Sequence, residues 1–482
     1  MKTFLELRNV LPLMHESPFH KPLNWTVNEG ETWAVVGRNG SGKTLFADVV
    51  CGKYNLLQGE IRYPFFEKIK AENPAERLKN HIKTVSFNSV YSIVDFREMY
   101  YQQRFNSAES EVSPPVADFF TEEEISSISP VFNTEKLLSR RIIQLSSGEL
   151  RKLLIAKILL EKPRMIIFDN PFIGLDTASR GQLDELFRQM AERGIMLVFL
   201  VPSEKDIPSA VTQVFPFRHC GLVPQSPVSF CHSDESQNLL FDGGLRVKPA
   251  MTETTPDYEV VAKMTDLNIS YGKNIIAKNI NWEVRKGEKW ALLGANGSGK
   301  STLLSYIFAD NPQAYSKDIV LFDRRRGTGE SIWDIKRRIG FTSSEMHLYY
   351  CENVPCLKVV ESGFFDSIGL FRQCSEEQTR IAEQFFDLLE INHLKDKLFL
   401  RISSGEQRLV LFARSLVKNP EVLILDEPFH GLDDENRARC LQIVEDFGKQ
   451  AGKTLIFVTH RAEEIPKCVD KSFVIANNNI LF

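Results

Sequence analysis

The sequence reads GRNGSGKT at residues 37–44 and returns to nearly the same stretch, GANGSGKS, at residues 294–301. Each copy fits the pattern G-x-x-x-x-G-K-[ST], and each stands between an apolar run typical of a buried strand and a segment compatible with a helix. Glycines at this spacing let backbone N–H groups close around phosphate oxygens, and the N-terminus of the following helix adds positive potential. The two stretches therefore predict an α/β fold with two phosphate-binding loops.

Each loop supplies a lysine that would neutralise the terminal phosphates of a nucleotide and a hydroxyl group that would bind Mg²⁺. The lysines are Lys43 and Lys300, and the hydroxyl groups belong to Thr44 and Ser301. A nucleotide with Mg²⁺ is thus the expected ligand of each loop. The residues predicted to contact it are Gly37, Asn39, Gly40, Ser41, Gly42, Lys43 and Thr44 in the first loop, and Gly294, Asn296, Gly297, Ser298, Gly299, Lys300, Ser301 and Thr302 in the second.

The loops belong to an internal repeat. The stretch LNWTVNEGETWAVVGRNGSGKT from Leu23 is echoed by INWEVRKGEKWALLGANGSGKS from Ile280, an offset of 280 − 23 = 257 residues. Strands and helices alternate in each copy, which indicates a mainly parallel sheet. A chain of 482 residues can hold two such domains, each with its own core. We expect domains at residues 1–208 and 259–482, joined by a loose linker at 209–258 that is rich in Pro, Ser and Gly.

Composition narrows the class of protein. Hydrophobic residues at 43% and charged residues at 25% are values of a globular chain. No apolar stretch is long enough to cross a bilayer and the N-terminus lacks a signal peptide, so we expect a cytoplasmic protein. The eight cysteines form no CxxC pair and predict reduced thiols. With a net charge of −4, nucleic acid is not an expected partner, and the basic stretch RRRGTGESIWDIKRR from Arg324 is interpreted as a solvated face.

A second repeated pair of motifs carries acids. The apolar runs MIIFD and VLILD end at Asp169 and Asp426, where a carboxylate at the end of a strand can hold Mg²⁺. The next residue would face an attacking water, and here the copies differ: Asn170 in the first, Glu427 in the second. A glutamate can polarise water or accept its proton, whereas an amide only forms hydrogen bonds at neutral pH.

The stretches LSSGELR from Leu145 and ISSGEQR from Ile402 complete the set of motifs. A serine–serine–glycine–glutamate stretch before an acidic strand and a GLD turn resembles the signature of ATP-binding-cassette ATPases, and the resemblance covers both halves. It implies two P-loop nucleotide triphosphatase domains, each with a mainly parallel sheet and a helical subdomain, and ATP as the nucleotide. Within that family the tandem arrangement resembles duplicated proteins of the ModF type, which are named for molybdenum transport and also called photorepair proteins.

The resemblance implies that the two halves pair head to tail, so that each ATP lies between the phosphate loop of one half and the signature of the other. It thereby implies two composite sites within one chain. The first would join Lys43, Thr44, Asp169 and Asn170 to Ser403 and Gly405, and the second would join Lys300, Ser301, Asp426 and Glu427 to Ser146 and Gly148.

Two further family positions support an asymmetry between the sites. An aromatic ring that stacks on adenine is supplied by Tyr271 in the second half, where the first half has Met14. A histidine that contacts the terminal phosphate is supplied by His460, and one gap aligns Pro202 with it. We therefore expect the first site to hold nucleotide and the second to hydrolyse it, with Lys300, Glu427 and His460 as the catalytic residues.

Three functions remain open at this stage. Family members that drive membrane channels carry a glutamine where this sequence aligns Phe87 and Ser344, which argues against docking at the membrane on a permease. A ribosome-associated role is the second alternative, although cassette proteins of that kind have a long charged linker. The leading hypothesis is a paired ATPase, with a link to molybdate as an expectation from resemblance.

Overall fold

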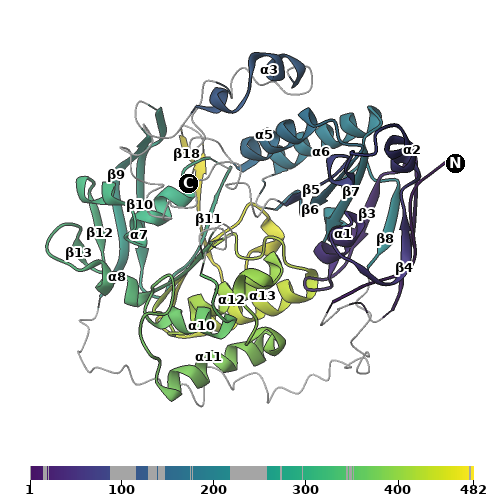
Figure 1. Cartoon of the computed structure of the whole chain (residues 1–482). Helices are drawn as coiled ribbons and strands as arrows, with labels where there is room; N and C mark the ends of the chain where they lie inside the picture. The colour runs from purple at the N-terminus through teal and green to yellow at the C-terminus, as the bar shows by residue number, and fades with distance from the viewer. Residues whose placement is uncertain are drawn as a thin grey trace. The chain divides into compact units, whose positions relative to one another are not determined.

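A computed structural model of the chain describes residues 2–14, 19, 21–86, 115–128, 138, 147–173, 175, 177–217, 258–271, 274–295, 297–343, 346, 350, 352–476 and 479–481. The chain divides into two compact units. The described residues up to Phe217 belong to the first, drawn from purple to blue-green in Figure 1, and those from Tyr258 onward belong to the second, drawn from green to yellow. Each unit is described by itself.

The first unit contains a parallel sheet of five strands in the order β5-β6-β7-β3-β8 and a sheet of three antiparallel strands in the order β2-β1-β4. Its elements are β1 (Thr3–Pro12), β2 (Leu23–Asn28), β3 (Trp33–Val36), α1 (Lys43–Val50), β4 (Leu56–Arg62), α2 (Pro64–Glu72), η1 (Leu78–Asn80), β5 (Ile82–Ser86), η5 (Val116–Phe119), α3 (Glu122–Ile128), α5 (Ser147–Leu160), β6 (Met165–Asp169), α6 (Thr177–Glu192), β7 (Met196–Val201), η7 (Glu204–Asp206) and β8 (Gln213–Pro216).

The second unit repeats this plan with one more strand in each sheet. The strand orders are β14-β15-β16-β11-β17-β18 and β10-β9-β12-β13. Its elements are β9 (Val260–Tyr271), β10 (Asn274–Arg285), β11 (Lys289–Gly294), α7 (Lys300–Ile307), η8 (Pro312–Ser316), β12 (Ile319–Leu321), β13 (Arg324–Arg325), α8 (Ile332–Arg338), β14 (Ile339–Ser343), α10 (Cys356–Glu361), η9 (Ser362–Phe364), α11 (Glu376–Leu388), η10 (Asn392–Leu394), η11 (Phe399–Arg401), α12 (Ser404–Leu416), β15 (Val422–Asp426), α13 (Asp434–Lys449), β16 (Thr454–Val458), η12 (Ala462–Glu464), β17 (Lys471–Ala476) and β18 (Asn479–Leu481).

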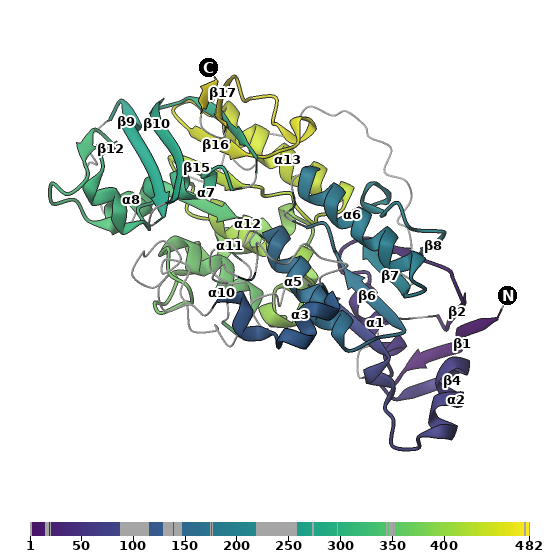
Figure 2. The same cartoon turned by 90° about the horizontal axis from the view of Figure 1, so that it is seen from above.

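Strand β15 shows why its apolar run is continuous. All five of its residues are buried, and alternate side chains enter different cores because successive residues of a strand face opposite ways. Val422 and Ile424 pack in the core beneath α7 and the antiparallel sheet, whereas Leu423 and Leu425 pack in the core formed with α10, α11, α12 and α13. The parallel sheet is thus the middle of three layers, and Figures 1 and 2 show α10, α11 and α12 gathered on one side of it.

The first unit follows the same rule. Ile167 in β6 packs with β1, β2 and α1, and its neighbours Ile166 and Phe168 pack with α5 and α6. The prediction of α/β domains with mainly parallel sheets is confirmed. The antiparallel sheets, and the antiparallel strand β18 at the edge of the second parallel sheet, were not predicted.

The boundary of the predicted linker needs one correction. Strand β8, Gln213–Pro216, falls inside the predicted linker at 209–258, yet it pairs in parallel with β3 from Trp33↔Gln213 to Val36↔Pro216. A strand of only four residues is too short to show a period of its own in the sequence. Residues 218–257, the rest of that segment apart from Tyr258, lie outside the described residues.

Candidate active site

Each phosphate loop lies between a central parallel strand and a helix. The first connects β3 to α1 and the second connects β11 to α7. The N-cap residues Gly42 and Gly299 have φ angles of 92° and 99°, a left-handed conformation that glycine adopts without steric cost. The second loop also passes very close to β17, because a Cβ atom on Gly294 would lie 2.6 Å from the carbonyl oxygen of Ile475. This is the local geometry that the loop motif predicts.

The polar atoms of both loops suit an anionic ligand. Lys300 Nζ donates to the carbonyl oxygens of Gly294 and Ala295 at 2.7 and 2.9 Å, and Lys43 Nζ donates likewise to Gly37 and Arg38. Within the described part of the chain, the buried hydroxyl groups of Ser41 and Ser298 have no hydrogen-bond partner. Unpaired buried hydroxyls are costly, and phosphate oxygens would accept hydrogen bonds from them. The loops therefore fit the nucleotide phosphates that the sequence predicts.

A hydroxyl–carboxylate pair adjoins each loop. Thr44 Oγ1 donates to Asp169 Oδ2 at 2.8 Å in the first unit, and Ser301 Oγ donates to Asp426 Oδ2 at 3.0 Å in the second. Burial raises the pKa of the Asp169 carboxyl, against the opposing effects of Thr44 and Lys43. Oxygen ligands of this kind fit Mg²⁺, so the four residues predicted to hold the metal ion form one pair in each unit.

The residue after each acidic strand has the same backbone conformation in both units. Asn170 and Glu427 both have a φ angle of 51°. The N–H group of Asn170 donates to Leu200 at 3.0 Å, and that of Glu427 donates to Val458 at 2.9 Å. Asparagine adopts this left-handed conformation readily, whereas glutamate does so at a cost. The two halves thus share a backbone and differ in the side chain that it presents.

The sheet register decides which residue of the first unit corresponds to His460. Asp426 pairs with Val458, two residues before His460, and Asp169 pairs with Leu200, two residues before Pro202. The position of His460 is therefore taken by Pro202 in the first unit. This agrees with the alignment that allows one gap, and Pro offers neither a side-chain donor nor a backbone N–H group.

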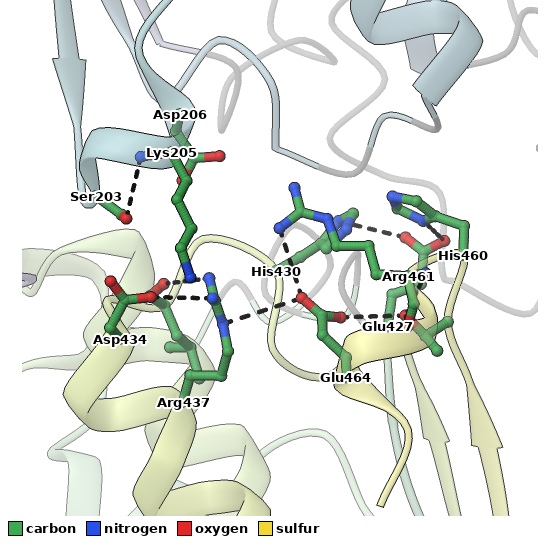
Figure 3. Close-up of polar contacts among 12 residues, drawn as sticks. Ser203, Lys205, Asp206, Glu427, His430, Asp434, Arg437, His460, Arg461 and Glu464 are labelled. Atoms are coloured by element: carbon green, nitrogen blue, oxygen red, sulfur yellow. Dashed lines mark hydrogen bonds and ion pairs between the residues drawn. The ribbon is translucent and has the colours of Figure 1, made fainter.

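In the second unit, Glu427 lies between two imidazole rings (Figure 3). His460 Nδ1 is 3.2 Å from Glu427 Oε1, and His430 Nδ1 is 3.4 Å from Glu427 Oε2. Burial raises the pKa of the Glu427 carboxyl, but His430, His460 and Lys300 together outweigh burial and leave the pKa below its usual value. Burial also lowers the pKa of His430, against the opposing effect of Glu427. Glu427 is accordingly a carboxylate held in place from two sides.

The turn that carries His460 has its own support. Thr459 Oγ1 donates to Glu464 Oε2 at 3.1 Å, and the N–H group of Arg461 donates to Thr459 Oγ1 at 3.1 Å. Glu464 is in turn within 3.9 Å of Arg437 from α13 and 3.6 Å of Arg461. Sequence reasoning missed these residues, as it missed His430. For His430 one signal was available, since Ile173 occupies its place in the first half.

The signature of the second half begins a helix. Ser403 is the N-cap of α12: its Oγ accepts from the N–H group of Glu406 at 3.3 Å, and Glu406 Oε2 accepts from the N–H group of Ser403 at 2.8 Å. Gly405 lies buried in the first turn. In the first half, Gly148 lies in the corresponding helix α5, while Ser146 lies outside the described residues.

Several other predicted positions are described only in part. Tyr271 is the last residue of β9, although its side chain is not described, and Met14 follows β1 as a half-buried residue. Asn296, Phe87 and Ser344 lie outside the described residues. The other predicted loop residues lie between the strand and the helix of their unit or at the ends of these elements.

Phosphate loops, hydroxyl–carboxylate pairs and acidic strand ends in both halves define a P-loop nucleotide triphosphatase with two nucleotide-binding units. The family model for the ABC transporter matches residues 20–173 and again residues 277–430. The chain belongs to this family, and it is a tandem ATPase that binds ATP and hydrolyses it to ADP and phosphate. None of the helices in the described part combines the length and apolar character needed to cross a membrane.

Similar proteins share the tandem length. The ABC transporter ATP-binding protein ModF of Escherichia coli is 35% identical over 461 residues, which cover 92% of this chain and 91% of that protein. An uncharacterised ABC transporter ATP-binding protein of Schizosaccharomyces pombe is 27% identical and covers 100% of this chain and 99% of its own length. The resemblance to a tandem cassette protein is confirmed.

A solved structure shows the same fold over most of the chain. A model of ribosome-bound archaeal Pelota and ABCE1 matches with a TM-score of 0.54 and 18% identity, covering 94% of this chain and 75% of that chain. At this identity the match concerns the fold alone.

Proposed function

We propose that the two halves have unequal tasks: the second loop, with Glu427 and His460, hydrolyses ATP, and the first mainly holds it. One observation carries this proposal. The two units share the same backbone at the residue after the acidic strand and the same sheet register beyond it, yet Glu427 and His460 are matched by Asn170 and Pro202. The second unit therefore has a carboxylate and an imidazole ring at two positions where the first unit has an amide and a proline.

The residues of the second unit divide the work. Lys300 would bind the terminal phosphates, and Ser301 and Asp426 would hold Mg²⁺, which neutralises charge on the transferred phosphoryl group. Glu427 would orient the attacking water for in-line displacement and accept its proton late, since a carboxylate of lowered pKa is a weak base. His460 would position the γ-phosphate, because its ring is fixed beside Glu427.

We further propose that the halves pair head to tail within one chain. Ser403 and Gly405 would then complete the first site, and Ser146 and Gly148 the second. The helix N-terminus that Ser403 caps would aim its free N–H groups at the terminal phosphate. The first cassette of this proposal extends through β8, and the linker follows it.

The work that the cycle performs is proposed from likeness alone. The resemblance of the sequence to duplicated proteins of the ModF type suggests a role linked to molybdate transport, with a membrane permease as partner, and the relative that is 35% identical is named as an ABC transporter ATP-binding protein. A soluble role at the ribosome is the alternative, and the ribosome-bound model of 18% identity supports it through the fold only.

The decisive experiment measures ATP turnover by the intact chain beside Glu427→Gln and counts bound nucleotide after rapid quenching. Loss of a group that positions or deprotonates water lowers the rate by roughly 100-fold or more. We expect that loss, with two ATP retained per chain. Turnover that survives in Glu427→Gln and disappears in Asn170→Ala would reverse the assignment. Adding membranes or ribosomes to the wild type then identifies any activator.

A further inference from the structure

We propose that Glu427, His430 and His460 form a binding site for a transition-metal ion of the zinc type, separate from the site for Mg²⁺. The three side chains offer one carboxylate oxygen and two imidazole nitrogens, and these ligand atoms all lie within 4.8 Å of one another. In the proposed hydrolysis Glu427 and His460 face water and phosphate, whereas His430, which is 4% exposed and buried beside them, only supports the Glu427 carboxylate. In the metal site this histidine would be a ligand in its own right.

The distances suit coordination. Ligands at about 2.0–2.1 Å from a tetrahedral zinc ion are about 3.3 Å apart. The observed separations are 3.2 Å from His460 Nδ1 to Glu427 Oε1 and 3.4 Å from His430 Nδ1 to Glu427 Oε2, so each imidazole nitrogen lies at about this spacing from its own oxygen of the carboxylate. The rings of His430 and His460 meet edge to face with centroids 4.9 Å apart, and one ligand nitrogen of each ring lies within 4.8 Å of the other (Figure 3).

The chemistry of the ligands selects the metal. Two imidazoles and one carboxylate favour zinc, cobalt, nickel or iron, whereas Mg²⁺ prefers oxygen ligands such as those of Ser301 and Asp426. The surrounding residues fix the ligands. The His460 turn is tied to Glu464 through Thr459, and the carbonyl oxygen of His430 accepts from Arg408. Three protein ligands leave a coordination position for water or a phosphate oxygen.

The first unit provides a natural comparison. At the positions of the three ligands it carries Asn170, Ile173 and Pro202. The turn itself is the same, because the N–H group of Ile173 donates to Asn170 at 3.3 Å and that of His430 donates to Glu427 at 3.4 Å. The ligand set is thus confined to one unit while its backbone frame is common to both, so one metal ion per chain is expected.

The test is titration of the intact, nucleotide-free chain with Co²⁺, followed by visible absorption and equilibrium dialysis under a phosphine reductant that keeps the thiols reduced. We expect one Co²⁺ per chain with an absorption band of nitrogen and oxygen coordination, which Zn²⁺ displaces. His430→Gln should weaken binding at least tenfold and remove the band. His393→Gln, which changes an exposed histidine of the same unit, should leave both unchanged.

Two more variants keep the test decisive. If thermal unfolding shows that His430→Gln is misfolded, His460→Gln removes a second ligand and should give the same loss. Ser301→Ala removes a ligand of the Mg²⁺ site and should leave the band intact. Absence of Co²⁺ binding, or a band that persists in a folded His430→Gln chain, overturns the proposal.

Inhibition of ATP turnover separates this inference from the proposed function. A metal ion on Glu427 and His460 withdraws both from hydrolysis, so Zn²⁺ should inhibit the wild type and a chelator selective for zinc should reverse the inhibition. If Co²⁺ binds as described but Zn²⁺ leaves turnover unchanged, the metal site stands and the catalytic role proposed for Glu427 fails.

Discussion

The difference between the halves is concentrated in side chains on a common backbone. Asn170 and Glu427 share a φ angle of 51°. A left-handed residue other than glycine, asparagine or aspartate is uncommon and costs roughly 1 kcal/mol or more. In the second unit this cost falls on Glu427, the residue that we propose to orient the attacking water. The first unit has the residue type that suits the conformation, which is what a site relieved of catalysis would retain.

Asn170→Ala should separate stability from activity. Alanine lacks the local hydrogen bonds that let asparagine adopt positive φ, so we expect a loss of about 1 kcal/mol from the free energy of unfolding of the first unit, with little change in turnover. Urea unfolding followed by fluorescence, together with an ATPase assay, measures both. A large fall in turnover at unchanged stability would contradict the proposed division of tasks.

At this scale the sequence predicts less than the structure describes. Walker-type loops and acidic strand ends follow from local patterns, and the pairs Thr44–Asp169 and Ser301–Asp426 confirm that those patterns converge. His430 could not be assigned from its own surroundings in the sequence, because a histidine in a turn has many uses. Its contact with Glu427 is made within one turn, three residues along the chain, whereas the contact of His460 with Glu427 depends on the register of β15 and β16, which is a property of the folded sheet.

Among the elements, the helical part of the second unit shows how tightly its segments pack. Gly363 lies in η9 against the end of α12, and a Cβ atom at this position would be 2.2 Å from the carbonyl oxygen of Arg414 and 2.7 Å from Val417. The side chain of Arg414 also contacts η9, because its Nε donates to Ser362 Oγ at 3.0 Å. The backbone of η9 therefore sits directly on the helix.

Gly363→Ala should destabilise the second unit by about 2 kcal/mol, because the added methyl group forces the two backbones apart. The matched control is Gly181→Ala in α6, where a Cβ atom meets nothing within 4 Å. That change should raise the stability of the first unit by about 0.5–1 kcal/mol through helix propensity. Thermal unfolding of both variants tests the pair, and equal effects would contradict this description of the packing.

A buried ion pair connects the segment that follows α12 to the loop after η9. Lys418 forms an ion pair with Asp366 and donates to the carbonyl oxygen of Lys336 at 2.7 Å. Burial, the largest cause, lowers the pKa of Lys418 to about 8, although Asp366 opposes the change. Above this pH the folded chain loses a proton that the unfolded chain keeps up to about pH 10.4.

The contribution of Lys418 to the free energy of unfolding should therefore increase as the pH rises from about 8 to 10, by at most about 1.4 kcal/mol per pH unit. The measurement compares urea unfolding of the wild type with that of Lys418→Gln across this range, because thiols and other lysines titrate alike in both. A difference between the two proteins that stays constant with pH would show that Lys418 keeps its proton.

Elements were predicted best where both faces of a strand are buried. The continuous apolar runs of β6 and β15 are recognisable as strands in the sequence. Strand β8 has only four residues and is not recognisable in this way. The basic stretch from Arg324 was interpreted as solvated, and Arg324 and Arg325 are indeed exposed. Lys336 is not, because it forms an ion pair with Asp310 at 2.6 Å with both side chains buried. Only the tertiary fold brings that partner to it.

For the whole molecule, the proposed pairing makes a prediction that crosses the halves. If the hydrolysing site combines Lys300 and Glu427 with the signature of the first half, then Ser146→Arg should abolish most turnover. Ser403→Arg should mainly affect nucleotide retention at the first site. The bulky cation would occupy the place of the terminal phosphate in either case. Steady-state ATPase and nucleotide counting on both variants decide the matter, and the opposite order of effects would refute head-to-tail pairing.

The position of β3 in the sheet also bears on how the protein is made. This strand leads into the first phosphate loop, but both of its neighbours, β7 and β8, come from the far end of the unit, and Thr32 bonds to Thr212 across 180 residues. A nascent chain emerging from its N-terminus thus displays the loop motif long before the strands that frame it are synthesised. We therefore expect the first half to bind nucleotide only once translation has passed β8, late in the synthesis of this unit.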